Sequence, residues 1–168
     1  MRRTLTLIAV IVAALLLQTT VFADVQLLGA RPELMYLVTI AFAMLEGPSS
    51  GAVTGFAGGM AQDLLLNNSP IGITALTLTL LGYAVGLLRQ YIVSPSPLLP
   101  VFLVAAGTFG GVVFYGVVSF LLGEQGSWAW LFRVAGLSGA YNAILTPIAY
   151  PILRRLAEGS RSQRVVRW

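Results

Sequence analysis

The most distinctive chemical group in the sequence is the carboxylate of Asp63, which ends a series of regularly spaced glycines. Gly51, Gly55 and Gly59 are four residues apart, and Asp63 continues the spacing. Residues four apart lie along one face of a helix, so the pattern predicts a helix face without side chains that ends in a carboxylate. In lipid, helices associate through close packing of such small residues. We therefore expect the glycines to contact a neighbouring helix or a partner protein.

Asp63 has two interpretations. An ionisable residue inside a membrane span costs about 2.5–3.5 kcal/mol at the helix centre and is by default a functional candidate. Asp63 lies close to the outer end of its apolar segment, so either a buried polar contact or a wetted interfacial position is possible. If it is buried, the sequence offers four candidate partners and does not choose among them: Arg133, Tyr83, Tyr141 and Asn142.

A second group of small residues follows in the next apolar segment, where Gly82 and Gly86 flank Tyr83. This spacing again predicts close helix packing. Asn142 lies near the middle of the last apolar segment, where an amide needs a hydrogen-bond partner on another helix. We expect these residues, like the first glycine series, to serve helix packing or partner binding.

Catalysis and cofactor binding find little support in this composition. The chain contains no histidine, cysteine or lysine, which removes thiolate zinc sites, His-ligated metals and imidazole-dependent nucleophiles. Phosphate loops and other catalytic motifs are also missing from the sequence. We therefore predict no catalytic residues, no cofactor and no metal.

The elements that position these residues must be membrane helices. Of the 168 residues, 57% are apolar and 10% are charged, and the mean hydropathy is +0.86. Soluble domains have about 45–50% apolar and roughly 25% charged residues, so an all-α integral membrane protein is expected. A span needs about 20 mainly apolar residues. Six segments meet or approach this length and form one predicted domain: 4–23, 32–45, 50–66, 71–88, 98–122 and 134–153.

The arginines predict the orientation. Six spans place both termini and the 46–49 and 89–97 loops on one side, together with eight of the ten arginines. Cytoplasmic loops are enriched in Arg and Lys, so both termini and the basic tail at 154–168 are expected in the cytoplasm. The basic residues thus indicate topology and contact with the bilayer, and no nucleic-acid partner is expected. A cleaved signal peptide is the alternative for the first span, but its apolar run of about 20 residues exceeds the usual 7–15.

The chain resembles the MreD family of rod shape-determining membrane proteins. The resemblance rests on three stretches: GFAGGMAQDLL at 55–65, PIG at 70–72 and LGYAVG at 81–86. That family typically has a glycine-rich helix ending in Asp-Leu, a turn with Pro and Gly, and a following helix with Gly-Tyr and a further Gly. Chain length, six spans and a short basic tail are also similar.

The resemblance implies a non-enzymatic scaffold of the bacterial elongation machinery in the cytoplasmic membrane. MreD-like proteins associate with MreC and, through it, with MreB, the RodA glycosyltransferase and a class B penicillin-binding transpeptidase. It also implies a fold similar to the substrate-binding subunits of energy-coupling-factor vitamin transporters. A subunit of such a transporter is the alternative function, with Ala9 and Ala13 as small residues four apart on the first helix.

Overall fold

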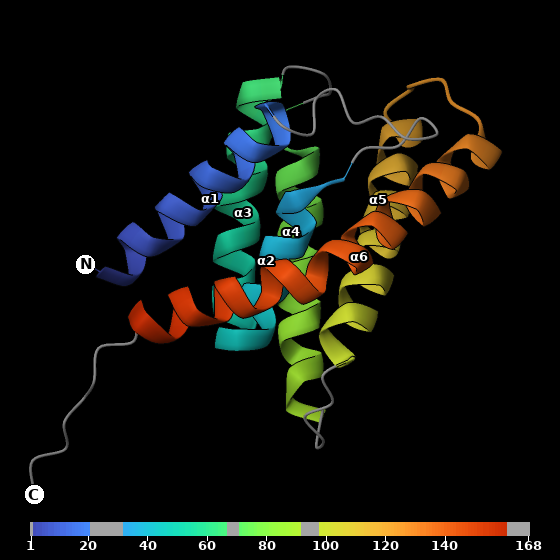
Figure 1. Cartoon of the computed structure of the whole chain (residues 1–168). Coiled ribbons are helices and arrows are strands. Elements are labelled where there is room, and N and C mark those ends of the chain that lie inside the picture. The colour runs from blue at the N-terminus through green and yellow to red at the C-terminus, as the bar shows by residue number, and fades with distance from the viewer. Residues whose placement is uncertain (1, 21–31, 67–70, 92–97, 161–168) are drawn as a thin grey trace, which may run out of the picture.

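The computed structural model describes residues 2–20, 32–66, 71–91 and 98–160, and this part of the chain is entirely helical. The described residues form six α-helices, drawn in Figure 1, and one short 3-10 helix, η1, which continues α4. The elements are α1 (Arg2–Thr20), α2 (Leu34–Glu46), α3 (Pro48–Leu66), α4 (Ile73–Leu88), η1 (Arg89–Tyr91), α5 (Leu99–Leu121) and α6 (Trp128–Ser160).

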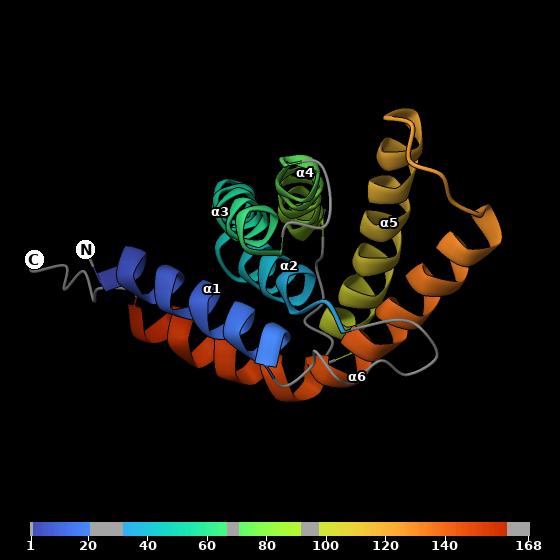
Figure 2. The ribbon, with the colours of Figure 1, turned by 90° about the horizontal axis from the view of Figure 1, so that it is seen from above.

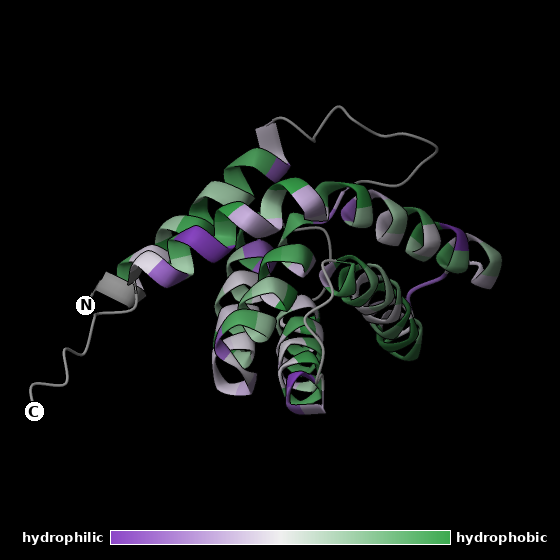
Figure 3. Ribbon diagram, turned by 60° about the horizontal axis from the view of Figure 1, so that its bottom comes forward, coloured by the Kyte–Doolittle hydropathy of each residue, from purple (hydrophilic) through white to green (hydrophobic). Residues whose placement is uncertain are grey.

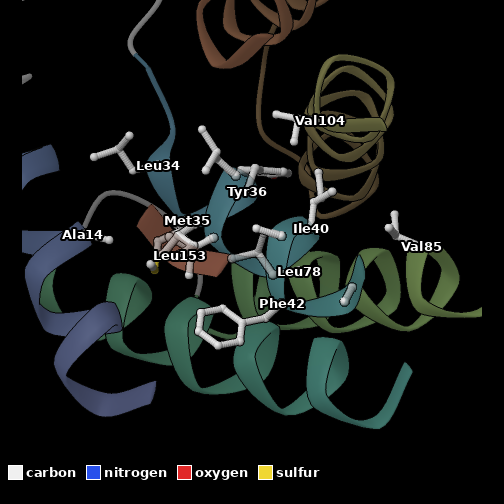
Figure 4. Packing of buried hydrophobic residues seen from close by; sticks show 14 of the residues in the cluster. Ala14, Leu34, Met35, Tyr36, Ile40, Phe42, Leu78, Val85, Val104 and Leu153 are labelled. Atoms are coloured by element: carbon white, nitrogen blue, oxygen red, sulfur yellow. The ribbon is translucent and has the colours of Figure 1, made fainter. Parts of the chain in front are cut away.

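Helix α2 forms the centre of the fold. Its first ten residues, 34–43, are all buried, and the whole helix is hydrophobic on every side, as expected for a helix surrounded by others. In Figure 4, Ile40 extends toward α5, and Phe42 extends toward α3. With 13 residues, α2 is about 20 Å long, which is shorter than the roughly 30 Å hydrocarbon core of a bilayer.

The other helices surround α2 on two sides. Seen from above, α1 and α6 lie side by side on one side of α2, α3 and α4 lie on the other, and α5 stands beside α2 and α4 (Figure 2). The first turn of α1 and the last turn of α6 are neighbours at one end of the molecule. Helix α1 contributes Val10, Ile11, Ala14 and Leu15 to the buried core, so it is an integral part of the packing.

Each of the six predicted apolar segments overlaps one observed helix, and the last helix extends beyond its predicted segment at both ends. Helix α6 begins at Trp128 and not near residue 134, and it continues to Ser160 through the start of the predicted tail. The continuation is explained by Leu153 and Ala157, which are 7% and 1% exposed and pack in the core. Arg154 and Glu158 form an exposed i,i+4 ion pair of 2.8 Å on a neighbouring face of α6.

Within the described residues, two helical stretches are long and apolar enough to cross a membrane by length and composition: Ile73–Tyr91, which is α4 with η1, and Leu99–Leu121, which is α5. Apolar residues cover most of the helices (Figure 3). The other four predicted spans remain predictions. Two of them correspond to shorter apolar helices, α1 and α2. Residues 67–70 and 92–97, which connect predicted spans, lie outside the described residues.

Candidate functional site

The glycine series of α3 lies directly against α4. A Cβ added to Gly51 would be 2.5 Å from the backbone oxygen of Gly82, and one added to Gly59 would be 2.5 Å from the Cα of Ala75. At Gly55, between them, a Cβ would overlap the backbone carbonyl of Leu78. The two helices therefore meet backbone to backbone along the whole series. Side chains on this face would separate them.

The glycines of α4 form the other half of the same contact. A Cβ at Gly82 would overlap the carbonyl of Gly51, and a Cβ at Gly86 would overlap Pro48, the first residue of α3. Tyr83 lies on a different face of α4, where its side chain is 50% exposed. The structure thus brings Gly51, Gly82 and Gly86 together and leaves Tyr83 outside the contact.

Asp63 links α3 to α4 beyond the Gly59 end of this contact. Its Oδ2 accepts hydrogen bonds from the backbone N–H groups of Gly72, at 2.8 Å, and Ala75, at 3.2 Å. These are donors at the N-terminus of α4, which lack partners within the helix and favour a negative charge nearby. Gly72 is the N-cap residue, with φ of 105°, and it has no side chain with which to cap the helix. Asp63 supplies the cap from α3.

Asp63 is 4% exposed, so the structure places it in a buried polar contact and not at a wetted surface. None of the four side chains considered as partners, Arg133, Tyr83, Tyr141 and Asn142, forms this contact. The donors are backbone amides of the adjacent helix. The close packing of α4 along α3 brings these amides to the carboxylate, which explains why a partner on a distant helix is unnecessary.

We expect substitutions at Asp63 to separate the role of its oxygen from the role of its charge. The Asp63→Asn variant keeps an oxygen acceptor and should fold, because asparagine is as good a cap as aspartate. The Asp63→Ala variant leaves one buried and one partly buried N–H group without this partner and should lose about 2 kcal/mol of stability. Thermal unfolding of the purified proteins in detergent measures both changes. An Ala variant as stable as the Asn variant would contradict the capping role.

Asn142 joins three helices at the centre of the molecule. This fully buried side chain donates through Nδ2 to the backbone oxygen of Glu33, at 3.0 Å, and to Oγ1 of Thr108, at 3.1 Å. Glu33 precedes α2, and Thr108 lies in the middle of α5. Asn142 therefore fixes the start of α2 against α5 and α6.

Sequence reasoning did not identify the partners of the two polar residues. Gly72, Ala75 and Glu33 all contribute backbone groups, whose position depends on the tertiary fold and has no sequence signal. Thr108 had a possible signal, since a threonine in the middle of an apolar helix is a candidate hydrogen-bond partner for an amide. Among the described residues, no group of three His, Cys, Asp or Glu side chains could hold a metal ion.

The described part of the chain is an all-helical fold in which α3 and α4 pack through their backbones and two helical stretches have the length and composition of membrane spans; these features are typical of a helical membrane protein. Comparison with known families gives the particular type. The family model of the rod shape-determining protein MreD matches residues 1–157. The chain belongs to the MreD family.

Membership defines the role in general terms. The protein is a rod shape-determining membrane protein, and its family comprises structural, shape-determining proteins and not enzymes. Neither the curated proteins nor the solved structures contain a match to the chain. The expected likeness to vitamin-transporter subunits therefore remains a prediction about the fold, and the alternative function as such a subunit has no support.

Proposed function

We propose that the protein is a non-enzymatic scaffold of the cell-elongation machinery in the bacterial cytoplasmic membrane. In this role it binds MreC and, through MreC, is linked to MreB, RodA and a class B penicillin-binding transpeptidase. The observation that carries the proposal is the family match over residues 1–157, which includes the glycine contact between α3 and α4, Asp63 and Asn142. In the described structure these residues contact other parts of the same chain, as a rigid scaffold requires.

Isolation of the tagged protein from native membranes tests the partner. We expect MreC to co-purify with it after mild solubilisation, and an unrelated multi-pass protein with the same tag serves as the control. Absence of MreC from preparations that retain other membrane complexes would contradict the scaffold. Hydrolysis of a substrate by the pure protein would contradict a non-enzymatic role.

The proposal includes six spans with both termini in the cytoplasm and the first helix retained. Two observations support it: the packing of α1 into the core and the adjacent positions of the start of α1 and the end of α6 (Figure 1). The distribution of the arginines supports the orientation, since Arg89, Arg154 and Arg155 would all lie on the inner side with the termini.

Reporter fusions test this topology. Fusions after Asn68 and after Gln125 should be active outside the cytoplasm, and fusions after Pro97 and after Trp168 should be active inside, because arginine-rich segments stay in the cytoplasm. Mass measurement of the mature protein checks whether the first helix is retained. An external C-terminus would contradict the proposed orientation.

A further inference from the structure

The outward face of α4 carries a tyrosine that the fold does not use. Tyr83 is 50% exposed, and Leu76, Leu80 and Leu87 are 48%, 48% and 37% exposed. Their spacing of four, three and four residues places all four on one helix face. A different face of α4 is occupied by the contact with α3. The outward face, defined by these four residues, therefore remains open in the described structure.

The depth of Tyr83 in the membrane makes this exposure unusual. The helical stretch Ile73–Tyr91 has the length and composition of a membrane span. At a rise of 1.5 Å per residue, Tyr83 is about 15 Å from Ile73 and about 12 Å from Tyr91. These distances place it near the middle of a hydrocarbon core about 30 Å thick. Membrane tyrosines are typically enriched at the two interfaces, where their hydroxyl groups meet water or headgroups.

The hydroxyl group of Tyr83 needs a partner at this depth. Within the described part of the chain no hydrogen bond to Tyr83 is found, whereas Thr79, one turn earlier, donates to the backbone oxygen of Ala75 at 2.5 Å. A hydroxyl without a partner in an apolar medium costs at least about 1–3 kcal/mol. Acyl chains supply no acceptor at this depth, but a protein helix can supply one through a hydroxyl, amide or carboxyl side chain.

We propose that the outward face of α4 binds a transmembrane helix of a different protein, and that this helix provides a hydrogen-bond acceptor to Tyr83 near the middle of the bilayer. The inference rests on the proposed scaffold function, which requires a partner that is itself in the membrane. Leu76, Leu80 and Leu87 would pack against the partner helix, while the hydroxyl of Tyr83 would fix its depth and rotation.

The Tyr83→Phe variant tests the hydrogen bond, because it removes the hydroxyl group and keeps the ring. We measure the affinity for full-length MreC, labelled for energy transfer, in liposomes. We expect a loss of about three- to twentyfold, which is the range of one interhelical hydrogen bond in a membrane protein. The control is Tyr91→Phe, the same change at an 80% exposed tyrosine in η1, and it should bind like the wild type. Thermal stability of both variants should be unchanged.

Photo-cross-linking tests the face itself. A photoreactive residue in place of Leu80 should cross-link to the membrane span of MreC, while one in place of Ile148, 66% exposed on α6, should not. Cross-links from position 80 to a second copy of this chain, or to lipid alone, would overturn the proposal. If wild type binds MreC and Tyr83→Phe binds equally well, this inference fails alone. If wild type does not bind MreC, the proposed function fails first.

Discussion

The Gly55→Leu variant is expected to leave little folded protein in the membrane. A Cβ at this position overlaps the backbone carbonyl of Leu78, and neither backbone can rotate away as a side chain could. Even Gly55→Ala must therefore separate α3 from α4. Overpacking typically costs about 1–3 kcal/mol and occasionally more, and we expect the leucine to reach or exceed the upper end, about 3 kcal/mol, a factor of more than 100 in the folding equilibrium.

The matched control is Gly110→Leu. Gly110 also lies in a long apolar helix, α5, but a Cβ there has no neighbour within 4 Å. Folded protein is measured as the monodisperse fraction after solubilisation, and cell shape is scored in a strain that depends on the variant. We expect the Gly55 variant to give low abundance and round cells, and the Gly110 variant to give normal rods. Normal abundance of Gly55→Leu with an intact MreC complex would contradict the packing role.

Close packing through glycines could be predicted from spacing, because a series at intervals of four has few other uses in an apolar helix. The identity of the neighbour was less certain, since a glycine face could equally bind another protein. In the structure the glycines of α3 lie against α4 and those of α4 lie against α3, so the neighbour belongs to the same chain. Tyr83, grouped with the same motif in the sequence, lies on a different, exposed face of α4.

The polar contacts were predicted less completely than the helices. A carboxylate at the end of a span indicates a need for partners, but it does not identify them when they are backbone amides. Asp63 caps α4 because the start of α4 packs beside the end of α3. The early start of α6 at Trp128 has a similar cause. Phe120 of α5 packs edge-on against Trp128, with ring centroids 4.9 Å apart, and this tertiary contact is invisible to hydropathy.

The central position of α2 leads to the second large effect, which we expect for Phe42→Ala. Phe42 is 1% exposed and extends from α2 toward α3 (Figure 4). Truncation of a buried phenylalanine typically costs about 3–5 kcal/mol, through lost packing and the remaining cavity. In a membrane this decrease in stability comes mainly from lost packing contacts, because the surrounding acyl chains give no hydrophobic drive for helix association.

The control for Phe42→Ala is the same substitution at Phe102, which is 70% exposed on α5 and should leave stability nearly unchanged. Thermal unfolding in detergent measures both. Because α2 contacts α1, α3, α4, α5 and α6, a cavity beside it should loosen the whole bundle, and the MreC complex should be lost only to the extent that folded protein is lost. A Phe42→Ala variant that is fully stable but no longer binds MreC would mean that Phe42 lies at a partner surface and that α2 is not the core of the fold.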